Sequence, residues 1–406
     1  MTALTTDVRH TIAIIGGGLA GASLALLLVQ QLPTHRVLLL EQHALPCDAS
    51  LPVLPSFDAR STALSYSTRD TLHHLGVWDA LQALSAPIVS VHVSEQHRPT
   101  GLLMQAAELA LPALGYVLEN RHLGHVLLHA LRQHPRIHCV DNTHIQQLHF
   151  TADAVHLHTD HTAYAAALAV IADGSHSALR QRLGIACDET PYHQSAVIAN
   201  VETEKPHNGM AYERFTRTGP VALLPLPAIG TRHRAALIWT VPQEEVHTVL
   251  SLSDTDFLLR VQERFGDRCG RLLAMGERHS YPLVLRQARE QVRSRMVLLG
   301  NAAHSLHPVA GQGFNLILRD CVALTDTLVA ANQQGQHAGE LSVLQRYLQQ
   351  QRWDQQKTIR ASDALPRLFG TTALPHTVLR TAVLLGLDFL PGLRPRFARE
   401  ATGLPS

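Results

Sequence analysis

The stretch "TIAIIGGGLAGASLALLLVQQL", residues 11–32, decides the fold. A strand-like segment runs into Gly16, Gly18 and Gly21, which have the spacing G-x-G-x-x-G, and an apolar helix-like segment follows. The stretch contains no charged residue, so hydropathy alone also allows a signal peptide or a membrane span. The clustered glycines favour a turn instead, as does the lack of basic residues just before the stretch other than Arg9.

A second strand-like run, "RVLLLE", ends at Glu41, twenty residues after Gly21. Strand, glycine turn, helix, strand and acid form the dinucleotide-binding pattern. Gly16 permits the tight turn, Gly18 lets a pyrophosphate approach the backbone, and Gly21 lets the helix pack on the strand. The helix N-terminus attracts the phosphates, and Glu41 accepts from a ribose hydroxyl. The pattern predicts a nucleotide cofactor rather than a packing turn alone, without distinguishing NAD from FAD.

Composition narrows the class of protein. The chain has 406 residues, 46% apolar and 17% charged, which predicts a globular protein of two domains or one domain with an insertion. Its net charge is +1 and no basic block occurs, so a nucleic-acid partner is not expected. The five cysteines are scattered, with no C-x-x-C, which favours a reducing compartment and argues against a disulfide-reductase flavoenzyme.

Two further turns follow buried strands. In "ALAVIADGSHSALRQRLG", residues 167–184, a strand ends at Asp173-Gly174 and a helix carrying Arg180 begins near Ser177. On its own this is an ordinary turn. In "RMVLLGNAAHSLHPVAGQGFN", residues 295–315, a short strand is followed by a glycine-rich turn, and a long helix starts near Gly313. The free N–H groups of that helix suit an anionic or electron-rich ligand.

Two groups of histidines suggest a metal site as an alternative to a nucleotide site. His304 and His307 lie in the late turn, but Pro308 breaks any helix that would align them, and no acid or cysteine in the turn completes a ligand set. The other candidates, His122, His125 and His129, share one face of a predicted helix. A solvated face of an amphipathic helix is the favoured interpretation there, and no metal is expected.

Taken in order, the three turns resemble the flavoprotein aromatic hydroxylases typified by para-hydroxybenzoate hydroxylase. Two further stretches are similar to that family, "FDARSTALSYSTRDTLHHLGVW" from Phe57 and "ENRHLGHVLLHAL" from Glu119. Within it the likeness is to the ubiquinone-biosynthesis hydroxylases. The stretches "GNAAHSLHPVAGQGFNLILRD" and "ERFTRTGPVALLPL" resemble the 2-polyprenyl-6-methoxyphenol hydroxylase branch.

The resemblance implies an α/β fold: a Rossmann-like FAD-binding domain with an inserted β-sheet substrate domain and a C-terminal helical region. The expected FAD-binding domain covers 1–75, 100–188 and 290–335, the substrate domain 76–99 and 189–289, and the helical region 336–406. The residues that the resemblance places at the cofactor are Gly16, Gly18, Gly21, Glu41, Arg60, Arg121, Asp173, Asn301, Gly311, Gly313, Phe314 and Asn315.

Asn301 departs from the family pattern, which has Asp at this position to accept from the ribityl chain. Asn keeps a carbonyl acceptor but loses the negative charge. No catalytic base can be named from the sequence. Tyr212, Arg214 and Trp239 are candidates for the substrate pocket, although each residue type more often packs a sheet.

The chemistry that the resemblance implies uses FAD, with NADPH or NADH as a transient electron donor and O₂ as oxidant, to hydroxylate a polyprenylated phenol. No second glycine pattern follows a strand, so NAD(P)H needs no domain of its own. The location expected is cytoplasmic, with peripheral contact at the inner membrane and a quinone-biosynthesis assembly as a further partner. The tail from Ala373 to Phe397 is apolar and ends in basic residues. Its apolar run near Thr381 to Leu393 contains Asp388 and Pro391 and is too short to span a bilayer, so the tail could dock on the core or touch the membrane.

Three alternatives remain open. The chain could hydroxylate another ring position of the same pathway. It could run another flavin reaction on the same fold, although the halogenase signature W-x-W-x-I-P is absent because Trp78, Trp239 and Trp353 are isolated. It could also be a non-catalytic member that scaffolds an assembly, for which Asn301 is the sole support.

Overall fold

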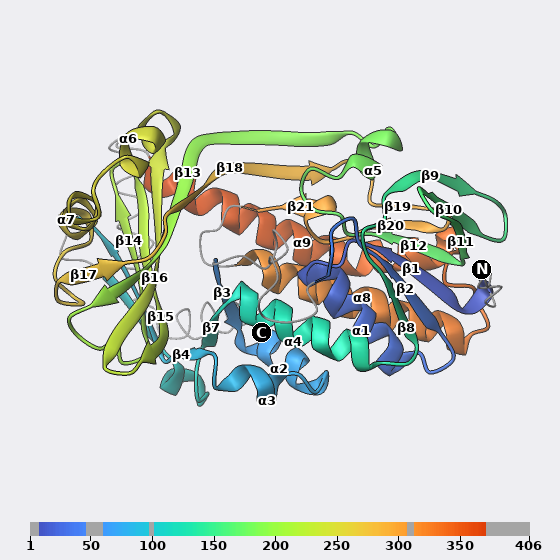
Figure 1. The fold of residues 1–406 in the computed structure, drawn as a ribbon, viewed down its shortest axis with the longest axis horizontal. Helices are drawn as coiled ribbons and strands as arrows, with labels where there is room; N and C mark the ends of the chain where they lie inside the picture. The colour runs from blue at the N-terminus through green and yellow to red at the C-terminus, as the bar shows by residue number, and fades with distance from the viewer. Residues whose placement is uncertain (1–7, 46–59, 97–100, 307–311, 371–406) are drawn as a thin grey trace.

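The computed structural model describes residues 8–45, 60–96, 101–306 and 312–370. Two sheets lie at opposite ends of an elongated molecule (Figure 1). The first has six strands in the order β19-β20-β12-β1-β2-β8, all parallel except β19. Its strands are β1 (Thr11–Ile15), β2 (Arg36–Leu40), β8 (Ile137–Val140), β12 (Leu168–Ile171), β19 (Val292–Arg293) and β20 (Met296–Leu298).

Both faces of this sheet are covered, which is why its strands read as continuous apolar runs. Ile12 and Ile14 point into a core with three helices, and Ala13 and Ile15 point into a second core on the other face. The helices are α1 (Leu19–Gln31), α4 (Asn120–Gln133) and α8 (Gln312–Gln333). The other face packs against α5 (Ala178–Arg182) and a small sheet of β9 (Ile145–Phe150), β10 (Val155–Thr159) and β11 (Ala163–Ala166).

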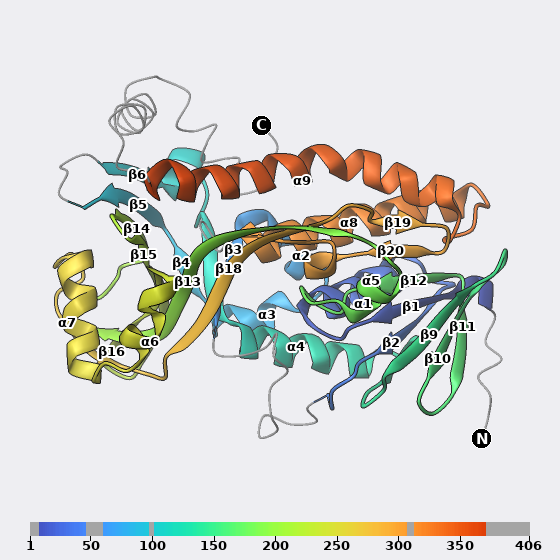
Figure 2. The same cartoon turned by 90° about the horizontal axis from the view of Figure 1, so that it is seen from above.

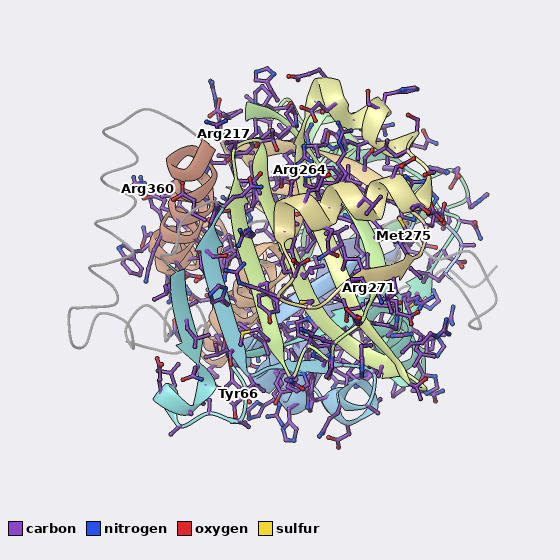
Figure 3. The ribbon with its side chains drawn as sticks, turned by 90° about the vertical axis from the view of Figure 1, so that its left-hand side faces the viewer. Tyr66, Arg217, Arg264, Arg271, Met275 and Arg360 are labelled. Atoms are coloured by element: carbon purple, nitrogen blue, oxygen red, sulfur yellow. The ribbon has the colours of Figure 1, made fainter. Side chains whose placement is uncertain are left out.

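The second large sheet has nine strands, and one of its faces is sealed by helices. In Figure 3 the helix α7 (Asp254–Phe265) lies across this outer face. Trp239 and Phe257 are fully buried between sheet and helix. The strands are β5 (Ser90–Glu95), β6 (Gly101–Gln105), β13 (Cys187–Thr203), β14 (Met210–Thr216), β15 (Gly219–Ile229), β16 (Arg232–Pro242), β17 (Leu272–Met275), β18 (His279–Ala288) and β21 (His304–Ser305).

Three connections hold the two ends together. The long strands β13 and β18 run from the large sheet toward the six-stranded sheet (Figure 1). The helix α9 (Leu341–Gly370) crosses the molecule above α8 (Figure 2). Between them lies another three-stranded sheet, formed by β3 (Ser61–Ser65), β4 (Ala86–Ile88) and β7 (Gly115–Glu119) and flanked by α2 (Tyr66–His74) and α3 (Trp78–Gln82).

The predicted fold class is confirmed, including the C-terminal helical region, of which residues 371–406 lie outside the described residues. The expected membrane contact of the tail falls on these residues. The predicted domain boundaries stay predictions; β6, within the range expected for the FAD-binding domain, pairs with β5 in the large sheet. Across the described ranges, no helix combines the length and hydropathy needed to cross a bilayer.

Candidate active site

The glycine turn after β1 has the geometry that the sequence predicts. Gly16 has a φ of +109°, and a Cβ on it would overlap the carbonyl of Ala172 at the end of β12. A Cβ on Gly21 would overlap the carbonyl oxygen of Gly16. Gly18 is the N-cap residue of α1, and no side chain caps this helix. The first N–H groups of α1 are therefore available to an anionic ligand.

The ends of four neighbouring parallel strands converge here. Starting from β1, the chain first adds β2 and β8 on one side of the sheet and later adds β12 and β20 on the other side. Open α/β sheets bind ligands at such a position, here between β1 and β12, where the strand order switches sides. In spatial order β2, β1, β12 and β20 are followed by Glu41, Gly16, Asp173 and Asn301. Parallel strands end at one edge of a sheet, so residues separated by 260 positions in sequence share one site.

The two acids of this edge differ in their partners. Glu41 accepts hydrogen bonds from the backbone N–H of Gly17 at 2.6 Å and of His43 at 3.0 Å. Asp173 accepts from the N–H of Leu179 through Oδ2 at 3.4 Å, whereas its Oδ1 is buried and has no hydrogen-bond partner in the described ranges. Burial raises the pKa of the Asp173 carboxyl. An orphaned acceptor beside an open glycine turn fits a polar ligand such as a dinucleotide.

Arg180 connects the turn that follows β12, at Asp173-Gly174, with the turn that follows β20, at residues 299–306 (the late turn). Its buried guanidinium donates to the carbonyl of Ala302 at 2.9 Å and to that of Ser175 at 3.3 Å. Asn301 lies beside Ala302 in the short helix η5 (Gly300–Ala302) and is exposed toward the cavity described below. The Arg180 bridge is a structural role that the sequence did not assign.

The start of α8 is held against β3. The side chain of Asn315 accepts from the N–H of Ser65 at 2.9 Å and donates to the carbonyl of Ala63 at 3.0 Å. Gly313 has open space where a Cβ would be, and Phe314 is buried. Gly313, Phe314 and Asn315 all line the cavity. The start of α8, which the sequence suggests for a ligand, therefore lies at the cavity wall. Gly311, His307 and Pro308 lie outside the described residues.

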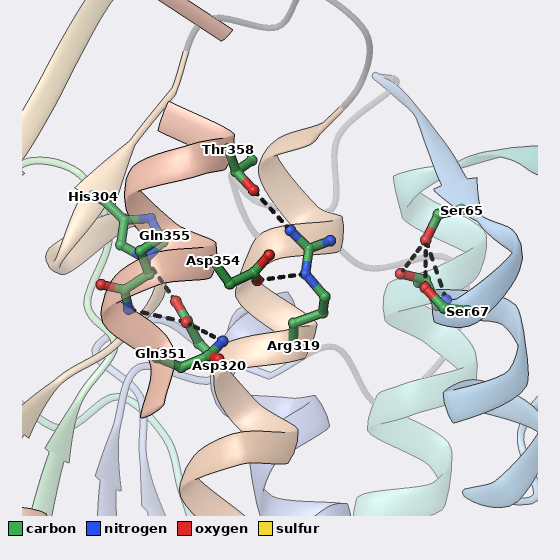
Figure 4. Close-up of polar contacts among 10 residues, drawn as sticks. Ser65, Ser67, His304, Arg319, Asp320, Gln351, Asp354, Gln355 and Thr358 are labelled. Atoms are coloured by element: carbon green, nitrogen blue, oxygen red, sulfur yellow. Dashed lines mark hydrogen bonds and ion pairs between the residues drawn. The ribbon is translucent and has the colours of Figure 1, made fainter. Parts of the chain in front are cut away.

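Behind the late turn is a buried polar network (Figure 4). His304 and Asp320 are almost fully buried, with Nε2 and Oδ2 2.6 Å apart. The other oxygen of Asp320 accepts from Gln351 at 2.9 Å and from Gln355 at 3.0 Å. The network joins β21, α8 and α9, so His304 has a structural partner. Among the described residues, no group of three potential metal ligands lies close together.

The two arginines implied by the resemblance have different positions. Arg60 lines the cavity, with its guanidinium 4.6 Å from the centre of the Tyr281 ring. Arg121 stands at the start of α4, half exposed and ion-paired with Glu119, and it does not line the cavity. Glu119 also binds Arg234 at 2.8 Å. The structure therefore brings Arg60 to the site and leaves Arg121 beside it.

One cavity of about 780 Å³ joins these parts. It begins at Gly18 and Ala20, passes β3 and the start of α8, and opens onto the inner face of the large sheet. That far wall is mainly apolar, with Val93, Met104 and Leu224 among its side chains. The shape suits a ligand with a phosphate-bearing end and a flat ring, with an apolar molecule at the ring.

The pocket candidates from the sequence lie mostly on the wrong face. Trp239 is fully buried against α7, and Arg214 donates to the carbonyl of Arg264 there. Tyr212 does line the cavity, although its ring packs 5.5 Å from that of Phe265. Their neighbour Glu213 instead faces the cavity. Strand alternation is the signal that could have found it, since Glu213 stands in phase with the apolar residues of its strand.

Fold and site together define a class of protein. The family model described as FAD binding domain matches residues 9–362. The crystal structure of p-nitrophenol 4-monooxygenase PnpA from Pseudomonas putida has a TM-score of 0.76 over 98% of this chain and 100% of that one, at 18% identity, which is a likeness of fold. The chain belongs to the FAD-binding-domain family and is an FAD-dependent monooxygenase.

Relatives place the chain further. Ubiquinone hydroxylase UbiL of Rhodospirillum rubrum is 33% identical over 98% of this chain and 91% of its own length. The 3-demethoxyubiquinol 3-hydroxylase of Escherichia coli is 32% identical over 98% of this chain and all of its own. Human ubiquinone biosynthesis monooxygenase COQ6 is 28% identical over 93% of this chain. The chain thus belongs to the family of ubiquinone-biosynthesis hydroxylases, which confirms the resemblance seen in the sequence.

Proposed function

We propose that this chain hydroxylates the aromatic ring of a polyprenylated phenol in ubiquinone biosynthesis, with a 2-polyprenyl-6-methoxyphenol-type compound as substrate. The observation that carries the proposal is the single cavity that runs from the glycine turn to the apolar face of the large sheet. A ring placed on that face is next to the cofactor end and out of bulk water. The relatives named for ubiquinone hydroxylation support the pathway.

The residues of the site fit FAD, as the orphaned Oδ1 of Asp173 and the crowded turn at Gly16 indicate. Bound FAD, reduced by NAD(P)H, supplies the activated oxygen. In this proposal the uncapped N-terminus of α1 holds the pyrophosphate, with Gly16, Gly18 and Gly21 giving it room. Glu41 accepts from the ribose; Asp173, Arg60 and Arg121 serve the nucleotide end.

In this proposal, Asn301 and the start of α8 bind the ring end of the cofactor. Asn301 offers a carbonyl acceptor to the ribityl chain. Gly313, Phe314 and Asn315 place the first N–H groups of α8 where negative charge develops on the reduced ring, which is stabilisation by preorganised donors. Because Asn315 is already bonded to β3, its role is to position the helix start.

Metabolite profiling of a deletion strain tests the substrate. Loss of the gene should halt ubiquinone synthesis and accumulate a polyprenylated phenol that lacks one ring hydroxyl. Accumulation of an intermediate blocked at a different carbon would favour the alternative ring position. Restoration of synthesis by a Gly16→Ala, Gly18→Ala double variant that holds no FAD would favour the scaffolding alternative.

The same strain tests the wider partners. A pull-down from membranes of the complemented strain would recover other quinone-biosynthesis proteins if the chain works in an assembly. Flotation of the purified holoenzyme with vesicles of anionic phospholipid tests peripheral membrane contact, and a variant ending at residue 370 tests whether the apolar tail provides it. Unchanged flotation of the shortened variant would remove the tail from the proposal.

A further inference from the structure

Glu213 is an acid on the apolar wall of the cavity. It lies in β14 between Ala211 and Phe215, which point the same way and belong to the apolar core of that wall. The register pairs Glu213 with Val93 on β5 and with Ala222 on β15. Its nearest neighbours across the sheet are therefore apolar on both sides.

The Glu213 side chain is half-buried on the cavity wall, and its carboxyl has no hydrogen-bond or ion-pair partner among the described residues. Burial alone raises its pKa from 4.5 to about 7. Two fully buried acids of this chain are paired: Asp320 has three partners, and Glu119 has two arginines. A polar group on an apolar wall that faces a ligand cavity and lacks a protein partner indicates that the ligand supplies the partner.

The charged groups around the cavity leave Glu213 alone. The charged side chains on β14 and its neighbour β5, such as Arg214 and His92, point to the outer face of the sheet. There Arg214 donates to the carbonyl of Arg264, and the ring of His92 packs on that of Tyr212. Besides Glu213, the titratable residues that line the cavity itself are Arg60, His176, Tyr212, Glu277, His279, Tyr281 and Arg286. Glu277 is exposed and pairs with His279, and Arg286 is bonded to Glu189.

We propose that Glu213 is a catalytic residue that accepts the proton of the substrate's ring hydroxyl during hydroxylation. This rests on the proposed function, since it requires a ring with a free hydroxyl in the cavity. The ionised carboxylate accepts a hydrogen bond from that hydroxyl, which pushes electron density into the ring. A charge-assisted hydrogen bond of this kind is about twice as strong as a neutral one.

The proton balance closes. As one oxygen atom of O₂ bonds to the ring carbon, the O–O bond breaks and the other oxygen leaves as water. The ring loses electron density and its hydroxyl becomes acidic; the O–H bond breaks and Glu213 gains the proton. The attacked carbon then releases its hydrogen as a proton to solvent, aromaticity returns, and Glu213 gives its proton back to the ring oxygen. Overall O₂, NAD(P)H and one proton are consumed, and water and NAD(P)⁺ are released.

A base of this kind is suited to neutral pH. General bases work best when their pKa lies near the operating pH, because both the ionised form and the driving force for proton transfer are then available. The apolar wall that strips water from Glu213 brings its pKa into that range. An exposed Glu would be ionised but too weakly basic to take the proton efficiently.

Binding to the oxidised holoenzyme tests the contact without turnover. Calorimetry would compare 2-prenyl-6-methoxyphenol with its O-methyl ether, which cannot donate a proton. Wild-type protein should prefer the phenol by about 10-fold or more above pH 8 and lose this preference below pH 6, following the ionisation of Glu213. A preference that is absent, or that does not change with pH, would overturn the role of Glu213.

Turnover measurements on a Glu213 variant and a control variant test whether the carboxylate itself is needed for catalysis. Glu213→Gln keeps the size and a neutral acceptor, so its preference should be smaller and independent of pH. Removing a general base costs about 100-fold or more in kcat/KM, with NAD(P)H oxidation then released as hydrogen peroxide instead of product. The matched control is Glu263→Gln, the same substitution on the exposed face of α7, which should behave as wild type.

The outcomes of the proposal and of the proposed function differ. Wild-type protein that neither binds nor hydroxylates the phenol would overturn the proposed function and the assignment with it. Active wild-type protein with an unchanged kcat/KM in Glu213→Gln would overturn only the assignment. If Glu213→Gln does not fold, the pH dependence of the preference for the phenol over its ether in wild-type protein still tests the role of Glu213.

Discussion

His304 and Asp320 form a pair at 2.6 Å inside the protein, with side chains 2% and 1% exposed. Their pairing connects the late turn to α8, and the two glutamines of α9 that bind the same carboxylate extend it to the C-terminal helix. The turn that presents Asn301 to the cavity is therefore anchored from behind. Buried networks of this kind are stabilising only when each member is satisfied.

Asp320→Ala should destabilise the protein strongly. The substitution leaves the ring nitrogen of His304 and the amides of Gln351 and Gln355 buried without an acceptor, and each such group costs about 1–3 kcal/mol. We expect a loss of at least about 3 kcal/mol in the free energy of unfolding, measured by urea denaturation of the holoenzyme. Asp153→Ala, in an exposed turn, is the control and should change stability little.

Gly16→Ala and Gly313→Ala should have different effects. At Gly16 the added Cβ overlaps the Ala172 carbonyl at a φ of +109°, so the turn must open and FAD should be lost, leaving colourless protein. At Gly313 the added methyl meets no protein atom, and Ala favours a helix over Gly by about 1 kcal/mol. Apoprotein stability, measured by thermal denaturation, should be kept in Gly313→Ala while FAD affinity falls.

A Gly313→Ala protein that binds FAD as well as wild type would contradict the placement of the flavin ring at the start of α8. Retained FAD in Gly16→Ala would contradict the placement of the nucleotide at the first turn. Absorbance at the flavin bands after gel filtration measures both.

Glu213 should make stability depend on pH. Because its folded pKa is raised to about 7 from 4.5, the folded state holds a proton between these values that the unfolded state has released. Its contribution to the free energy of unfolding therefore falls as pH rises from about 4.5 to 7 and is level above. A shift of this size corresponds to about 3 kcal/mol.

Glu213→Gln should lack this fall. Chemical denaturation of both holoenzymes at pH 5 and pH 8 would show the variant gaining relative to wild type as pH rises. Equal pH dependence of the two proteins would mean that Glu213 has an ordinary pKa in the folded protein.

Asn301→Ala should weaken FAD binding modestly. The side chain is exposed toward the cavity, and one hydrogen bond to a ligand contributes about 0.5–1.5 kcal/mol, or about 3- to 10-fold in affinity. Asn301→Asp keeps the carbonyl acceptor and should bind FAD as wild type does. Flavin fluorescence titration of the apoprotein measures both, and an unchanged affinity in Asn301→Ala would remove this residue from the cofactor site.

Much of the cofactor end could be predicted from local sequence. A strand, a turn that tolerates only Gly at Gly16, and an uncapped helix are set by residues close together in the chain. The same holds for β12, which ends two residues before Asp173, and for the helix that starts near Gly313. The family followed from the order of these turns, and the comparisons confirm it.

The substrate end could not be predicted in the same way. Arg214 and Trp239 were candidates for the pocket by residue type, yet they face α7, because side chains alternate between the two faces of a strand and nothing local says which face is covered. Glu213 had no motif to mark it. Arg121 pairs with the buried Glu119 and does not line the cavity, so its role at the nucleotide end stays a prediction.

The sequence by itself determined the class of fold, the family and the three turns, because turn geometry and helix starts depend on neighbours within a few residues. Tertiary structure alone decided which ends meet: Asn315 binds β3 across 250 residues, and Asp320 joins three elements. It also placed Glu213, half-buried and unpaired among the described residues, on an apolar wall of the cavity. That position raises the pKa of its carboxyl by desolvation and depends on packing between distant segments.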